Sequence, residues 1–253
     1  MKPTPRTFAL AGGVIALGTT GAVFGARWLA SARRAAERNA RIAAGGPVTE
    51  LHVPHERGNI VLDGDMDDPG WLKKSARTSA FVGADGVTAA RPYSEARLVW
   101  GDGFLYVALY AADEDIRAKQ EGLDAPVWLD DSFHLVFSDG AVERSFDVSA
   151  TAVLADGERK VGVTAAGGAR PFDYRWSSGA HLSREIDGTL NKPDDEDEEW
   201  GIEMAIPFEA LGMKGEKGEK ILFSAHRCDT PHSGVRSCGS WGEAAAHGLL
   251  TLD

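Results

Sequence analysis

Three aspartates at alternating positions form a dense group of possible metal ligands. Asp63, Asp65 and Asp67 lie in one predicted turn, and Asp68 follows directly. Calcium prefers oxygen ligands, and the spacing Asp-x-Asp-x-Asp resembles the first half of a calcium-binding loop. The glycine and the terminal glutamate of an EF-hand are missing. Asp63, Asp65 and Asp67 are therefore calcium candidates, and turn formation and capping are the alternative role.

Further acids flank the predicted strands, and paired carboxylates can hydrolyse glycosidic bonds. Asp113 with Asp115, and Asp130 with Asp131, are such pairs. Nothing in the surrounding residues distinguishes one of these acids as a proton donor. The sequence also shows no Ser-His-Asp motif, no phosphate-binding loop and no zinc-site spacing. We therefore expect a protein that is not an enzyme.

The only two cysteines of the chain, Cys228 and Cys238, stand ten residues apart. The loop between them contains Pro231 and Gly234, which favour a turn. A single pair that closes a short loop suits a disulfide in an oxidising compartment. Two buried thiols are the alternative. The pair favours export from the cytoplasm.

The amino-terminal part differs in charge from the rest of the chain. Residues 1–45 hold seven basic side chains and one acidic one, which gives a net charge of +6. Because the whole chain has a net charge of −11, residues 46–253 have a net charge of −17. An acidic part of this size repels phosphate backbones, which excludes nucleic acid as an expected partner.

An uncharged apolar run, Phe8 to Phe24, follows Lys2 and Arg6. It could be a cleaved signal peptide or an uncleaved membrane anchor. We favour the anchor because Arg27 crowds any cleavage site, and we expect residues 1–45 to form this anchor with a helical linker. The positive charges after the run argue for the opposite orientation, but the cysteine pair favours a domain outside the cytoplasm, periplasmic or at the cell surface.

The remainder, residues 46–253, is predicted to be one β-rich domain. Short runs with a period of two alternate with turn residues, and thirty glycines and eleven prolines support many turns. A short helix is expected at Asp68-Pro69 and one helical turn at 208–212. The acidic stretch 191–199 is expected to be a solvated loop. The strands are predicted at 96–100, 104–110, 132–137, 145–150, 201–207, 221–227 and 248–252.

Many short strands with few helices predict an all-β fold, an antiparallel β-sandwich of the immunoglobulin-like or jelly-roll-like kind. The strand 104–110 is apolar on both faces and is expected to lie in the centre of a sheet. Alternation in 132–137 predicts that Phe133, Leu135 and Phe137 share the core face and that His134 lies on the opposite one.

The order of several short motifs carries a resemblance to a known family. The motifs are Leu62-Asp63-Gly64, Asp68-Pro69-Gly70-Trp71, Ala96 to Trp100, Phe104 to Ala108, Asp113 to Ile116, Trp128 to Ser132, Trp200 to Pro207, Ser240-Trp241 and Gly248 to Leu250. Together they resemble the family 9 carbohydrate-binding modules of the DOMON-like superfamily, over about residues 59–253. The resemblance implies a sugar-binding β-sandwich, often an appendage of exported glycoside hydrolases that serve polysaccharide degradation.

The same resemblance implies two sugar-binding tryptophans. In the family, one tryptophan precedes an Asp-Ser strand, which matches Trp128, and the other stands seven residues before a glycine, which matches Trp241 and Gly248. Two aromatic faces that enclose a pyranose should stand about 7–8 Å apart. The alternative is that both indoles only cover the core.

The polar partners depart from the family pattern. Its strand glutamate is His134 here, and its arginine and asparagine on the next strand are Asp147 and Ser149. These side chains still donate or accept hydrogen bonds, so the expected site consists of Trp128, Trp241, His134, Asp147 and Ser149, with a glycan or oligosaccharide as partner. The changes place the family's usual sugar specificity in question.

A haem-binding electron-transfer domain is the alternative from another class. Some DOMON-like domains hold haem through methionine with histidine or lysine, and Met66, Met204 and Met213 exist here beside several histidines. Met204 has a core pattern, and no Cys-x-x-Cys-His motif is present. A third possibility is an adaptor domain of the same fold without a ligand. The sequence favours a membrane-anchored, non-catalytic carbohydrate-binding domain.

Overall fold

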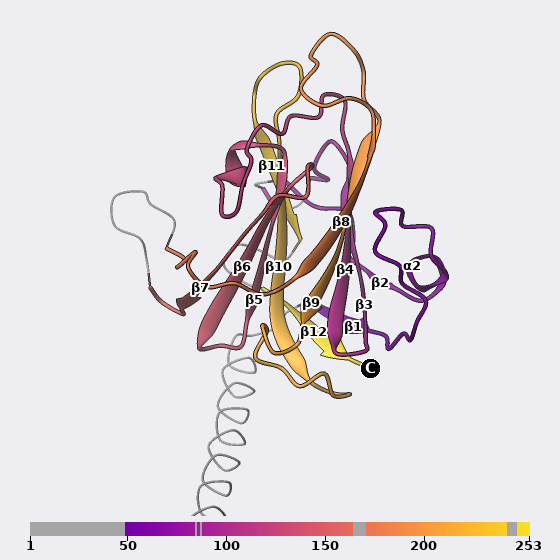
Figure 1. Ribbon diagram of the computed structural model, residues 1–253, viewed down its shortest axis with the longest axis vertical. Coiled ribbons are helices and arrows are strands. Elements are labelled where there is room, and N and C mark those ends of the chain that lie inside the picture. Colours follow the sequence, from indigo (N-terminus) through magenta and orange to yellow (C-terminus); the bar gives the residue numbers. More distant parts are fainter. Residues whose placement is uncertain (1–48, 84, 87, 164–170, 242–246) are drawn as a thin grey trace, which may run out of the picture. The chain divides into compact units, whose positions relative to one another are not determined.

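Two β-sheets pack face to face in the computed structural model, which describes residues 49–83, 85, 86, 88–163, 171–241 and 247–253 (Figure 1). The described residues belong to one unit of the chain, Arg41–Asp253. The seven-stranded sheet has the order β1 (Glu50–Val53), β12 (Gly248–Leu252), β10 (Lys220–Asp229), β5 (Ser132–Ser138), β6 (Val142–Ser149) and β7 (Leu154–Lys160), and β11 (Ser237–Trp241) also pairs with β10. The five-stranded sheet has the order β2 (Ala76–Arg77), β3 (Ser94–Gly101), β4 (Phe104–Ala112), β9 (Glu199–Pro207) and β8 (His181–Asp187).

The predicted all-β sandwich is confirmed, with one correction. The pairs are antiparallel except that β1 runs parallel to β12. These strands come from the two ends of the described chain, so no hairpin forces them to run in opposite directions. The membrane anchor predicted at residues 8–24 lies outside the described residues. Within the described part, no helix is long and apolar enough to cross a membrane.

The core lies between the sheets and follows the predicted alternation. Phe133, Leu135 and Phe137 of β5 are fully buried, and the Phe137 ring lies 4.9 Å from that of Phe223 in β10. From the five-stranded sheet, β3, β4 and β9 contribute further large side chains, including Trp100 and Met204. The strand predicted at 104–110 is central, because β4 pairs with both β3 and β9.

Two local expectations need correction. The segment 208–212 forms hydrogen-bonded turns rather than a helix, with Leu211 N–H donating to the Phe208 carbonyl at 3.0 Å. The acidic stretch 191–199 is not wholly solvated, because the Asp197 side chain is buried. Its carboxylate accepts hydrogen bonds from the N–H groups of Thr189 (2.6 Å) and Ile116 (2.8 Å), which offset the burial of the charge.

The outer face of the five-stranded sheet is covered by residues 56–75, which include the predicted helix, α2 (Pro69–Lys73) (Figure 1). Trp71 of α2 is fully buried against Val99 and Ala108, and its indole N–H donates to the carboxylate of Glu203. The N–H of Gly64 donates to the same carboxylate at 2.7 Å. A Cβ at Gly64 would lie 2.2 Å from the backbone of β8, so only glycine fits there.

Candidate functional site

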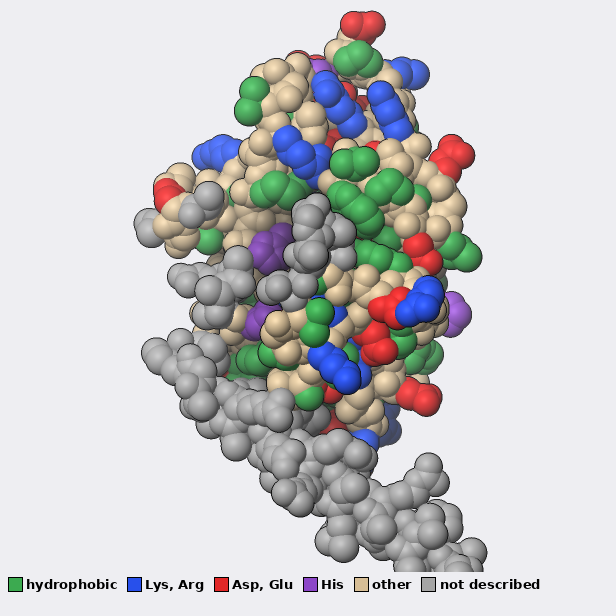
Figure 2. Space-filling model, turned by 90° about the vertical axis from the view of Figure 1, so that its left-hand side faces the viewer, with side chains coloured by type: hydrophobic (Ala, Val, Ile, Leu, Met, Phe, Trp, Pro, Cys, Tyr) green, Lys and Arg blue, Asp and Glu red, His purple; other side chains and the backbone are tan. Residues whose placement is uncertain are grey.

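The predicted polar residues lie on the outer face of the seven-stranded sheet. His134 in β5 is directly opposite Asp147 in β6 and directly opposite His226 in β10. Because opposite residues of an antiparallel pair share a face, these three side chains form one row across three strands. The histidine side chains in the middle of this face, beside hydrophobic ones, can be seen in Figure 2.

Hydrogen bonds fix part of this row. The Nδ1 atom of His134 lies 2.8 Å from Oδ1 of Asp147, whose side chain is only 1% exposed, whereas that of His134 is 26% exposed. Burial lowers the pKa of His226 to about 4, with a smaller contribution from the neighbouring imidazoles of His134 and His247. His226 is therefore a neutral imidazole at pH 7.

Aromatic side chains flank the row. Trp128 lies in the 3₁₀ turn Val127–Leu129 just before β5, is half-buried, and has its ring 5.7 Å from that of Tyr174. Phe172 lies 6.2 Å from the His134 ring, and the Arg159 guanidinium lies 4.6 Å above the Phe172 ring. The face thus combines flat apolar surfaces with hydrogen-bonding groups.

Sequence reasoning missed the segment that holds Phe172 and Tyr174. Gly157 in β7 leaves room for it, because a Cβ at that position would lie 3.0 Å from Cβ of Phe172. Asp173 pairs with Glu158 through backbone hydrogen bonds, which extends the sheet beyond β7. The alternation Phe-Asp-Tyr was the available signal for a strand-like segment with both rings on one side.

The other two predicted ligand contacts are placed differently. Trp241 is directly opposite Ala225, a core residue of β10, so its indole points between the sheets. It is 5% exposed and packs 5.7 Å from the Phe223 ring. The expected pair of facing indoles is therefore not formed. Ser149 is fully buried, and its hydroxyl lies 2.9 Å from that of Thr151.

The predicted disulfide between Cys228 and Cys238 is confirmed, with Cα atoms 4.1 Å apart. It joins β10 to β11 two residues beyond His226. In the hairpin that it closes, Arg236 donates to the carbonyls of Trp128 (3.1 Å) and Asp130 (2.7 Å). The covalent link thus helps to position the turn that carries Trp128.

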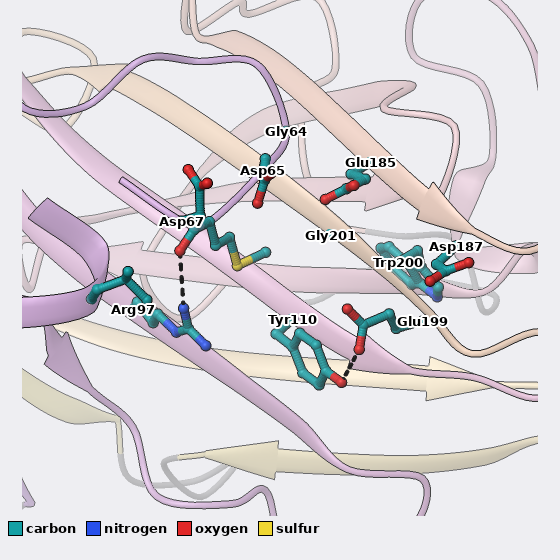
Figure 3. A pocket seen from close by; sticks show the side chains of 12 residues that line it. Gly64, Asp65, Asp67, Arg97, Tyr110, Glu185, Asp187, Glu199, Trp200 and Gly201 are labelled. Carbon is teal, nitrogen blue, oxygen red and sulfur yellow. Dashed lines mark hydrogen bonds between the residues drawn. The ribbon is translucent and has the colours of Figure 1, made fainter. Parts of the chain in front are cut away.

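The calcium candidates lie on the other sheet. Asp65 and Asp67 line a cavity of about 240 Å³ at the outer face of the five-stranded sheet, and the Asp63 carboxylate accepts the N–H of Asp65 at 3.1 Å, as a turn-forming aspartate does (Figure 3). Glu185, Asp187 and Glu199 also line this cavity, against the single guanidinium of Arg97.

This cavity is strongly negative. Burial, and then the charges of Asp65 and Glu199, raise the pKa of Glu185. Burial and a hydrogen bond to Glu199 raise the pKa of Tyr110 to about 12. The excess of carboxylates in this cavity favours a cation over a neutral ligand. The aromatic rings described above lie on the opposite sheet.

A buried charged cluster joins the two sheets at one end. Arg227 donates to Asp113 and to Asp229, both at 2.9 Å, and the indole N–H of Trp200 donates to Asp113 at 2.9 Å. Asp131 accepts the N–H groups of Arg117 and Thr230, both at 2.7 Å. Among the described residues, Asp113, Asp131 and Asp229 form the one set of three possible ligands with atoms within 4.8 Å.

Two aspartates of this cluster, Asp131 and Asp229, have raised pKa values. Burial, and next the charge of Asp113, raise the pKa of Asp131 to about 7. Burial raises the pKa of Asp229 to about 6, although Arg227 pulls it down. The guanidinium of Arg227 supplies a positive charge between Asp113 and Asp229, which offsets part of the cost of burying these carboxylates. Sequence reasoning saw Asp113 and Asp131 but not their partners on β10.

The methionines of the haem alternative do not lie beside the histidine row. Met204 is on the core side of β9, and Met213 packs in the same core. Met66 packs against the Trp71 cluster on the five-stranded sheet.

Comparison with known proteins confirms the resemblance at the level of the fold. A candidate carbohydrate-binding protein from Bacteroides uniformis superposes with a TM-score of 0.59 at 15% identity, covering 82% of this chain and all (100%) of that one. A family 9 carbohydrate-binding module from Caldicellulosiruptor kristjanssonii, in complex with cellotriose, superposes with a TM-score of 0.53 at 16% identity, covering 81% and 94%. A family 9 module from the same organism, in complex with glucose, superposes with a TM-score of 0.53 at 16% identity, covering 81% of this chain and 96% of that one. No family model matches the sequence, and no curated protein matches it significantly.

The fold is therefore that of the family 9 carbohydrate-binding modules. Trp128, which precedes the Asp-Ser strand, lies near the outer face of the seven-stranded sheet, where His134 and His226 are half-buried.

Proposed function

We propose that this protein binds carbohydrate, without catalysis, at the outer face of the seven-stranded sheet. The observation that carries the proposal is the juxtaposition of Trp128 and Phe172 with the polar row of His134 and Asp147 on one face. Aromatic rings pack against the C–H face of a pyranose, and imidazole nitrogens exchange hydrogen bonds with its hydroxyls.

The residues have separate roles in this proposal. Trp128 stacks on the sugar, and His134 contacts a hydroxyl. Asp147 acts through His134, because its carboxylate is buried beneath that ring. Trp241 and Ser149 receive no ligand contact, because the first lies in the core and the second is bonded to Thr151. The similar modules are bound to cellotriose and glucose, which makes these sugars the first ligands to test.

A glycan array probed with the full chain, with and without calcium, tests the function, and titration calorimetry with the best ligand tests the site. Trp128→Ala should weaken sugar binding at least tenfold, because an aromatic stacking surface is lost. The matched control is Leu72→Ala, whose side chain is 54% exposed on the opposite sheet and should leave affinity unchanged. Equal affinity of the Trp128 variant and the native chain would contradict the proposed site.

We also propose that the domain is held outside the cytoplasm by the segment Phe8 to Phe24. The apolar run and the disulfide support this, since disulfides persist in oxidising compartments. Protease treatment of intact spheroplasts should digest the domain. Protection until the cells are lysed would place the domain in the cytoplasm. The absorption spectrum of the purified protein tests the haem alternative, which requires a Soret band.

A further inference from the structure

Two histidines face each other across neighbouring strands of the seven-stranded sheet. His134 and His226 are directly opposite in the antiparallel pair of β5 and β10, and their ring centroids lie 5.8 Å apart at an interplanar angle of 37°. Opposite side chains on one sheet face start from Cβ atoms about 5 Å apart. Two imidazoles at this spacing can direct one nitrogen each to a shared point with small rotations of their side chains.

The hydrogen bonds of the two histidines leave ring nitrogens on both of them available to bind a metal ion. Because Asp147 accepts the proton on Nδ1 of His134, the lone pair of that ring is on Nε2. A buried carboxylate behind a histidine is the arrangement that orients metal-binding histidines in many proteins. Within the described part of the chain, neither ring nitrogen of His226 has a hydrogen-bond partner.

A third imidazole lies nearby on the same face. His247 has its Nδ1 atom 3.0 Å from the hydroxyl of Ser224, which is two residues before His226 and therefore on the same side of β10. Its Nε2 atom lies 3.9 Å from Glu143. It is thus held by other partners and is not needed for a two-nitrogen chelate.

We propose that His134 and His226 chelate one divalent transition-metal ion of the Zn²⁺, Ni²⁺ or Cu²⁺ class, with Asp147 as the residue that positions His134. Imidazole nitrogen favours these ions over calcium or magnesium, which prefer oxygen. Two protein ligands leave coordination positions open for water or a hydroxyl group. The inference does not rest on carbohydrate binding, although His134 belongs to both sites, so a bound ion would lie next to the sugar.

Titration calorimetry of the untagged full chain with ZnCl₂ tests the chelate. The native protein should bind one ion at this site, and His134→Ala and His226→Ala should each weaken binding at least tenfold. Asp147→Asn should weaken it about tenfold, as loss of a carboxylate behind a ligating histidine does. His181→Ala removes an exposed histidine from the five-stranded sheet and should leave zinc binding unchanged.

Electron paramagnetic resonance with Cu²⁺ separates ligation from a structural role. The native spectrum should show coupling to two imidazole nitrogens, and each single variant should lose one. His226→Asn serves if His226→Ala does not fold, since it keeps a polar side chain of smaller size. Unchanged zinc affinity and an unchanged copper spectrum in both histidine variants would overturn the proposal. Metal binding in a chain that binds no glycan would refute only the proposed function.

Discussion

The two outer faces of the sandwich differ in how they hold their polar side chains. The five-stranded sheet buries a charged side chain, Glu203, beneath residues 56–75, and Trp71 and Gly64 donate hydrogen bonds to it. Burial nevertheless raises the pKa of Glu203. On the seven-stranded sheet the polar row is partly accessible, with His134 exposed at 26% and Asp147, directly opposite it, buried.

The difference places the main contribution to stability on one outer face and the proposed binding site on the other. A covered face gains apolar burial and satisfied hydrogen bonds, and its residues are then unavailable to a ligand. The open face, which is the outer face of the seven-stranded sheet, is only partly accessible, because Asp147 and Ser224 are buried there. It presents the half-buried side chains of His134 and His226, whose positions are fixed by their strands. Substitutions on the covered face should therefore change the free energy of unfolding, and those on the open face should change affinity.

The largest effect is expected at Trp71. Trp71→Ala should lower the free energy of unfolding by about 3–5 kcal/mol, because it leaves a cavity and removes a donor from Glu203. Urea unfolding followed by circular dichroism measures this. Leu72→Ala, on the same helix but 54% exposed, is the control and should cost far less. A loss below about 1 kcal/mol for Trp71→Ala would mean that the cover adds little to stability.

The second effect tests the cluster where the two sheets meet. The pKa of Asp131 rises from 3.8 to about 7 on folding, so the folded state binds its proton more tightly than the unfolded state. Stability should therefore fall as the pH rises from about 4 to about 7, by at most about 4 kcal/mol from this group. Asp131→Asn should flatten this slope in urea unfolding at several pH values.

Asp102→Asn, in the exposed β3–β4 turn, is the matched control for the pH experiment and should leave the slope unchanged. Asparagine suits the positive φ of 51° there. If Asp131→Asn keeps the full slope, the pH dependence arises elsewhere, and the raised pKa of Asp229 becomes the next group to test.

The third effect concerns the disulfide on the open face. Replacing Cys228 and Cys238 by serine should lower the free energy of unfolding by about 2 kcal/mol, because the cross-linked loop is short. It should also weaken sugar binding, since the same hairpin carries Arg236, which holds the carbonyl of Trp128. Thermal unfolding and calorimetry of the double variant measure the two effects. Stability loss with unchanged affinity would separate the hairpin from the site.

The smallest effect is expected for the stability of the Trp128 variant. Trp128→Ala should change the free energy of unfolding by about 1 kcal/mol or less, because the ring is half-buried at the edge of the open face. Urea unfolding measures this in the protein used for the binding assay. A loss as large as that of Trp71→Ala would show that Trp128 is a core residue and would remove the contrast between the faces.

Local alternation was enough to predict the strands that line the core. Phe133, Leu135 and Phe137 were placed inside and His134 outside because the side-chain period of a strand is two residues. The same reasoning located the β3–β4 hairpin and the start of α2 at Pro69. It missed β8, His181–Asp187, an edge strand in which Arg184 stands between the two apolar residues of the inner face, Leu182 and Ile186.

The candidate site was only partly predictable. Trp128, His134 and Asp147 were located through the resemblance to the family, and they lie near one face of the seven-stranded sheet. Trp241 was expected to face Trp128, but its register opposite Ala225 turns it into the core. A shift of one residue in that pairing would reverse the direction of the indole, and nothing local in the sequence specifies it.

The sequence by itself therefore determined which side chains share a face within each strand, and it determined the disulfide through its only two cysteines. The tertiary structure decided which strands became neighbours. It placed His226 beside His134 and Arg227 against Asp113, although 92 and 114 residues separate these partners. The physical reason is that periodicity is a property of the local backbone, whereas strand register depends on how the whole core packs.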